Sequence, residues 1–258
     1  MEPEAREWKL RAAAIPGALL VALAFHAWPT GHFLQRTFLS MMVHELGHAV
    51  TAWWCGFGAI PTLWRTMIPE TRGLVWLLVT GLEIGFVVFG WKRQRLVLVL
   101  VGLALGAIQL VAITASSEVA HAWIIFGGDG GAMVLGTLLM AGFFVPKLRE
   151  HGLRWGLLAI GAAAFVDTFA TWWAARGDLD VIPFGEIEGV GLSDPSKLTE
   201  VYGWNVDQLV HRYVALGVTC LVALAAVTVW QVLRSRNSTL GAAGPDVASG
   251  SDHDAAQP

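Results

Sequence analysis

Charged residues are scarce in this sequence. Asp, Glu, Lys and Arg make up 14% of the 258 residues, whereas a soluble domain usually carries about 25%. The few charges are also unevenly spread, because none occurs in residues 12–35, 96–117 or 213–233. Each of these gaps reaches the ~20 residues that a helix needs to cross a lipid bilayer. The scarcity argues against a soluble protein and predicts an integral membrane protein that crosses the bilayer several times.

Other features are also missing. The net charge is -3 and no basic stripe occurs, which argues against a nucleic-acid partner. The two cysteines, Cys55 and Cys220, have neither metal-ligand spacing nor a disulfide pattern, so we expect free thiols within or beside membrane segments. The first apolar stretch lacks a small-x-small cleavage site at residues 25–30, so it is interpreted as a retained span and not as a signal peptide.

The apolar segments predict an all-α fold, a polytopic bundle of about six to seven membrane spans within one domain, residues 1–235. The predicted spans cover residues 13–30, 33–54, 73–91, 95–115, 121–144, 155–175 and 208–232. Short connections between several of them imply antiparallel neighbours.

Three segments outside the spans have their own character. Residues 56–72 contain two prolines and alternating apolar residues, which predicts a short interfacial hairpin or a re-entrant segment. Residues 176–207 are acidic and rich in glycine and proline, so we expect a solvent-exposed loop. The tail, 236–258, consists mainly of small and polar residues and is expected to be disordered.

One predicted span carries the sequence His44-Glu45-Leu46-Gly47-His48. Histidines four residues apart lie on one face of a helix, within reach of one metal ion. Glu45 is the only formal charge in residues 37–64, and an ionised group at the centre of a membrane helix costs ~2.5–3.5 kcal/mol. The motif therefore predicts a metal site in which Glu45 accepts a proton from a metal-bound water.

Asp129 is the best candidate for a third metal ligand, because it stands alone among four glycines in residues 127–131. Glycine lets a backbone approach another helix or a substrate closely. At 1.5 Å per residue, His48 lies ~9 Å from the end of its predicted span and Asp129 ~12 Å from the start of its own. In antiparallel spans, the two side chains would then lie at nearly the same depth.

The remaining ionisable residues of the spans are weaker candidates. Asp167 and Glu83 are alternatives to Asp129, but roles behind the ligands or in helix packing suit them better. His26, His32 and His121 lie near the ends of spans, where we expect structural roles.

The sequence His44-Glu45-Leu46-Gly47-His48-Ala49 resembles the zinc motif of the site-2 protease family of intramembrane metallopeptidases. Asp129-Gly130-Gly131 resembles that family's Leu-Asp-Gly motif, which supplies the third zinc ligand, although Gly128 stands in place of the leucine. The similarity covers about residues 33–144. It implies a zinc-dependent metalloendopeptidase: Zn²⁺ bound by His44, His48 and Asp129, Glu45 as general base, and a membrane protein or peptide as substrate.

Two other functions remain open. In a membrane metal transporter the same residues would form a transit site, and Glu83, Asp167 and His121 could supply further ligands along a path. A non-catalytic membrane protein could hold a structural metal, or none. The small size fits an enzyme of the prokaryotic cytoplasmic (inner) membrane.

Overall fold

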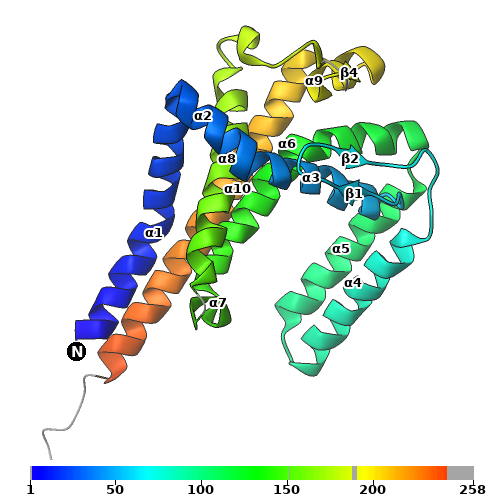
Figure 1. The fold of residues 1–258 in the computed structure, drawn as a ribbon. Coiled ribbons are helices and arrows are strands. Elements are labelled where there is room, and N and C mark those ends of the chain that lie inside the picture. Colours follow the sequence, from blue (N-terminus) through cyan, green and yellow to red (C-terminus); the bar gives the residue numbers. More distant parts are fainter. Residues whose placement is uncertain (1, 151, 188–190, 243–258) are drawn as a thin grey trace, which may run out of the picture.

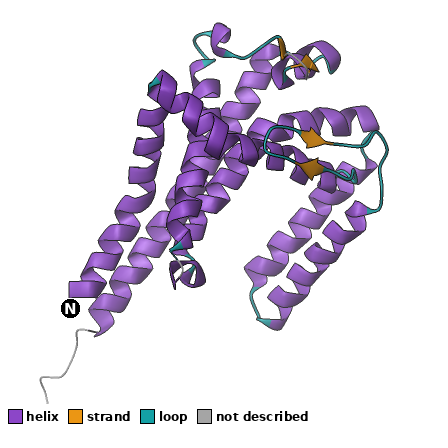
Figure 2. Cartoon of the chain, in the orientation of Figure 1, coloured by secondary structure: helices purple, strands orange, loops and turns teal. Residues whose placement is uncertain are grey.

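The computed structural model describes residues 2–150, 152–187 and 191–242, and these are almost entirely helical (Figures 1 and 2). Among them, six helices are long and apolar enough to cross a membrane, which confirms the predicted all-α membrane bundle. These helices are α1 (Glu2–Ala27), α4 (Val75–Lys92), α5 (Leu96–Thr114), α6 (Ser117–Ala141), α8 (Leu153–Ala174) and α10 (Val206–Ala242).

The predicted span at residues 33–54 is helical throughout, but it is not among these six helices. The segment is divided into α2 (Pro29–Gln35), a π-helical turn η1 (Arg36–Ser40) and α3 (Met41–Trp54). Figure 1 shows α2 and α3 running across the long helices instead of along them. The histidine motif lies on α3, whose apolar residues Val43, Ala49 and Ala52 are buried against protein.

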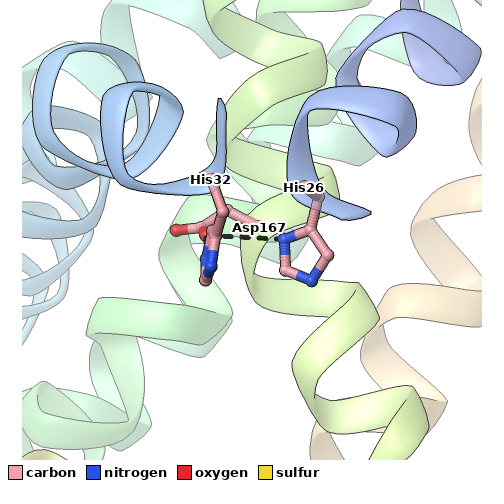
Figure 3. Close-up of side chains that lie close together, drawn as sticks. All are labelled: His26, His32 and Asp167. Carbon is pink, nitrogen blue, oxygen red and sulfur yellow. Dashed lines mark hydrogen bonds and ion pairs between the residues drawn. The ribbon is translucent and has the colours of Figure 1, made fainter. Parts of the chain in front are cut away.

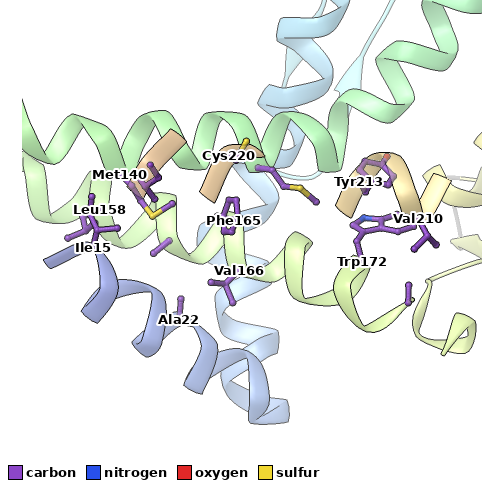
Figure 4. Packing of buried hydrophobic residues seen from close by; sticks show 14 of the residues in the cluster. Ile15, Ala22, Met140, Leu158, Phe165, Val166, Trp172, Val210, Tyr213 and Cys220 are labelled. Carbon is purple, nitrogen blue, oxygen red and sulfur yellow. The ribbon is translucent and has the colours of Figure 1, made fainter. Parts of the chain in front are cut away.

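Four long helices form the main bundle. Buried apolar side chains of α1, α6, α8 and α10 pack into one core that includes Phe165, Trp172 and Tyr213 (Figure 4). Between α6 and α8 the chain forms a short 3-10 turn, η2 (Gly142–Phe144), and then α7 (Pro146–Glu150).

The helices α4 and α5 form an antiparallel pair that stands apart from the main bundle in Figure 1. Before this pair, β1 (Ile60–Pro61) and β2 (Thr66–Met67) form an antiparallel hairpin that contacts α3. This confirms the hairpin predicted for residues 56–72.

The acidic connection after α8 contains several short elements. They are η3 (Leu179–Val181), β3 (Glu186–Ile187), β4 (Gly191–Leu192), α9 (Asp194–Ser196) and η4 (Lys197–Val201). The last helix, α10, continues to Ala242, into the segment that was expected to be disordered. The rest of that predicted tail, residues 243–258, lies outside the described residues.

The helices α3 and α6 touch backbone to backbone. A Cβ atom on Gly131 would lie 2.4 Å from the Cα atom of Gly47, and one on Gly47 would lie 2.3 Å from the main-chain oxygen of Gly127. Any side chain at these positions would push the two helices apart. The glycines around Asp129 therefore allow a close crossing, while α6 stays helical through them.

We predict that Gly131→Ala lowers the free energy of unfolding by ~1–3 kcal/mol, the usual cost of overpacking, because the new methyl group meets backbone. The measurement is thermal or denaturant unfolding in detergent. Gly81→Ala is the matched control, since a Cβ atom at Gly81 of α4 has no neighbour within 4 Å, and it should change stability by no more than ~1 kcal/mol. Equal stability of the two variants would contradict the close crossing.

Candidate metal centre

The rings of His44 and His48 are each fixed through their Nδ1 atom by a group on α6. Nδ1 of His48 lies 2.7 Å from the main-chain oxygen of Ile124. Nδ1 of His44 lies 2.9 Å from Oδ1 of Asp129. Both partners only accept hydrogen bonds, so each neutral ring carries its proton on Nδ1. The Nε2 atom of each ring is then left with a lone pair, which is the form that binds a metal.

The two Nε2 atoms meet at one point with a carboxylate. They lie 3.1 Å apart, and Oδ2 of Asp194 lies 3.2 Å from Nε2 of His44 and 3.0 Å from Nε2 of His48. A tetrahedral zinc ion with bonds of ~2.0–2.1 Å needs its ligand atoms about 3.3–3.4 Å apart. A metal ion or a proton between these three atoms would relieve the repulsion of their lone pairs. His44, His48 and Asp194 could therefore hold a metal ion.

Asp194 is the site residue that the sequence analysis did not find. It is the first residue of α9, preceded by the N-cap Ser193 and followed by Pro195. The connection that carries it was expected to be solvent-exposed, yet Pro195, Ser196 and Leu198 are buried. Two signals were available: a connection this long within a compact domain is often functional, and Ser-Asp-Pro is a typical helix start.

The charge state of Asp194 suits a metal ligand. Burial acts to raise the pKa of its carboxyl group, but hydrogen bonds from His44 and His48, whose Nε2 atoms can carry a proton when no ion is bound, outweigh the burial and hold this pKa well below its ordinary value. The carboxyl group is thus ionised at neutral pH, as coordination requires. Lys197 lies 3.4 Å from the other oxygen, Oδ1.

Asp129 lies beside His44, as the depth argument predicted, but on the far side of the ring from Asp194. Its Oδ1 faces Nδ1 of His44, and its Oδ2 accepts a hydrogen bond from Nε1 of Trp172 at 2.8 Å. Both carboxylate oxygens are therefore engaged away from the point where the Nε2 atoms meet. The geometry disfavours the ligand role predicted for Asp129 and points to Asp194. Asp129 instead orients the ring of His44, as carboxylates commonly do with histidines that bind zinc.

Gly128, the residue before Asp129, makes room for the two imidazoles. A Cβ atom there would lie 2.5 Å from Nε2 of His48 and 2.6 Å from Cε1 of His44. The glycine-rich segment of α6 thus serves both the helix crossing and the seating of the rings.

Glu45 is buried and is held by the β1–β2 hairpin. The hydroxyl oxygen of Thr66, in β2, lies 2.7 Å from Oε2 of Glu45 and 2.7 Å from its main-chain oxygen. The described hydrogen bonds involve no partner for Oε1. The hairpin therefore fixes one carboxylate oxygen of Glu45, the glutamate that follows His44 in the motif.

The other candidates lie in different surroundings. Glu83 is buried on α4, and its Oε1 has no hydrogen-bond partner among the described residues. Nδ1 of His121 contacts the main-chain oxygen of Ser117, in its own helix. Asp167 lies with His26 and His32 beside the η1 turn, where it contacts Arg36 and Ser40. None of the three joins the group around His44 and His48.

An apolar cavity adjoins the crossing of α3 and α6. Its volume is about 530 Å³, and its wall comes from α3, α5, α6 and α10. Gly47, Thr51 and Gly127 are among the lining residues, which places the cavity beside the helix segment that carries the two histidines.

Comparison with protein-family models, with curated proteins and with solved structures finds no match to the chain. The resemblance to site-2 proteases thus stays a prediction from the motifs, and what the site can do has to follow from its own geometry.

Substitution of Asp194 and of Asp129 should reduce zinc affinity to different extents. Asp194→Asn removes an anionic ligand and should weaken zinc binding more than ~100-fold, whereas Asp129→Asn removes only the group behind His44 and should cost ~10–100-fold. Competition with a chromophoric chelator, on detergent-solubilised protein, gives both affinities.

Asp207→Asn is the control, because Asp207 is exposed and outside the group, and it should leave the affinity unchanged. A larger loss for Asp129→Asn than for Asp194→Asn would reverse the assignment and restore Asp129 as the ligand.

Proposed function

We propose that this protein is a zinc-dependent intramembrane metalloendopeptidase, which hydrolyses peptide bonds of membrane proteins or peptides. The observation that carries the proposal is the convergence of two imidazole Nε2 atoms and the Asp194 carboxylate within 3.2 Å of one another. Three protein ligands leave one position of a tetrahedral site open, as catalytic zinc sites do. The motif glutamate Glu45 stands beside these ligands in the sequence, and six helices of the described chain are long and apolar enough to cross a membrane.

Each residue of the centre has a distinct task. His44, His48 and Asp194 would hold Zn²⁺, which when bound supplies a polarising Lewis acid and lowers the pKa of water. Asp129 and the Ile124 carbonyl keep the two rings turned so that Nε2 faces inward. Glu45 acts as general base: Thr66 holds Oε2, so Oε1 takes the proton of the attacking water and passes it to the leaving amine.

The substrate is proposed to reach the centre from the membrane. A helical segment in lipid bonds its own carbonyls, so it must unwind before a carbonyl can be attacked. The apolar cavity beside Gly47 offers a place for the side chains of such a segment. The hairpin that holds Glu45 also exposes Leu63 and Trp64, and it would contact the unwound strand. The proposed location is the prokaryotic cytoplasmic membrane, which the small size of the protein favours.

A membrane metal transporter is the second candidate, because one observation favours it. Transport needs further ligands beyond one site, and His26, His32 and Asp167 form another group of possible metal ligands. The two functions differ in what they require of Glu45, which hydrolysis needs as a base and transit does not.

Glu45→Gln tests the proposed chemistry. The amide cannot accept a proton, so cleavage should fall ~10²–10⁴-fold, while the unchanged ligands keep zinc bound. The assay is mass spectrometry of transmembrane peptides incubated with reconstituted protein, together with the zinc content of each preparation. Glu118→Gln, at an exposed position of α6, is the control and should cleave like the parent.

Full cleavage by the Glu45→Gln protein would refute the mechanism. If neither the parent nor the variant cleaves, and both carry zinc into proteoliposomes at the same rate, the transporter would replace the protease.

A further inference from the structure

A second group of possible metal ligands joins three helices outside the centre described above. His26 lies near the end of α1, His32 in α2 and Asp167 in α8, and their ligand atoms all lie within 4.8 Å of one another. Nε2 of His32 is 2.7 Å from Oδ1 of Asp167, and Nδ1 of His26 is 3.8 Å from the same oxygen. Figure 3 shows both rings turned toward the carboxylate.

The carboxylate of Asp167 is held rigidly. Its side chain is 1% exposed, deep in the bundle. Oδ2 accepts hydrogen bonds from the Ser40 hydroxyl and, at 3.0 Å, from the Arg36 guanidinium. These two contacts fix the plane of the carboxylate and leave Oδ1 as the oxygen that faces both histidines.

The Nδ1 atom of His26 lacks a hydrogen-bond partner among the described residues. It is buried and makes no hydrogen bond within the described part of the chain, although buried polar atoms are nearly always paired. The ring of His26 also lies against that of His32, with centroids 4.4 Å apart. A bound cation would satisfy the Nδ1 atom of His26 and the Nε2 atom of His32 at once.

We propose that His26, His32 and Asp167 form a second metal site, which takes a divalent transition cation such as Zn²⁺. Two imidazoles and one carboxylate are a usual ligand set for that ion. The distances of 2.7 and 3.8 Å to Oδ1 lie on either side of the about 3.3 Å that tetrahedral coordination needs. Arg36 stays on Oδ2, so the ion binds through Oδ1 alone.

The site has a structural consequence for the motif helix. Ser40, which donates to Asp167, directly precedes α3 and lies four residues before His44, or about 6 Å along a helix. A metal here would tie the ends of α1 and α2 to α8, and so fix the start of the helix that carries the histidine motif. The site does not depend on the proposed peptidase activity.

Metal content of tag-free protein in detergent, measured by mass spectrometry after equilibration with zinc, tests the site. The parent should hold two equivalents. His44→Ala/His48→Ala should hold one, and so should His26→Ala/His32→Ala, because each pair removes one site. His211→Ala, at an exposed position of α10, is the control and should hold two.

Two equivalents in folded His26→Ala/His32→Ala protein would overturn the proposal. Should that variant fail to fold, a Co²⁺ titration of the His44→Ala/His48→Ala protein decides. The absorption of tetrahedral Co²⁺ should saturate at one equivalent, and the absence of any signal would refute the second site. Adding His32→Ala to this background should abolish the signal.

Discussion

The candidate centre depends on two helix backbones in direct contact. Where α3 crosses α6, Gly47 meets Gly127 and Gly131 with no side chain between them. Only this approach brings the Ile124 carbonyl and the Asp129 carboxylate of α6 within hydrogen-bond distance of rings on α3. A larger residue at the crossing would move the fixed groups away from the rings they orient. The position of the groups that orient the two histidines therefore depends on the glycines at the crossing.

The sequence predicted most of the helices and the motif, because both follow from local patterns. Apolar runs of about 20 residues give spans, and two histidines four apart give one helical face. Hydropathy does not distinguish burial in lipid from burial in protein, and residues 33–54, which are helical throughout, make contacts that it could not predict. The short α3 is apolar because it packs against α6 and the hairpin, which only the tertiary structure reveals.

The third ligand was harder to predict, for a different reason. Depth along antiparallel helices correctly brought Asp129 next to His44, but depth cannot say which ring nitrogen a carboxylate will face. Asp129 faces Nδ1, and Nε2 faces Asp194, more than 60 residues further along the chain. That meeting depends on how the connection between α8 and α10 folds back, which no periodicity in the sequence encodes. The sequence analysis assigned structural roles to His26 and His32 and treated Asp167 as an alternative ligand, but it did not predict that the three lie together.

The candidate centre takes its residues from both a helix and a loop connection. Affinity for the proposed ion would therefore be coupled to the folding of that connection. His44 and His48 come from a helix locked in the bundle, whereas Asp194 comes from a connection outside the membrane helices. An ion that binds only when all three are assembled stabilises the folded-back connection by RT ln(1 + [ion]/Kd). By the same linkage, any molecule that lifts the connection away weakens ion binding by an equal free energy. In the proposed zinc site, ion binding would therefore be coupled to the folding of the connection that carries Asp194.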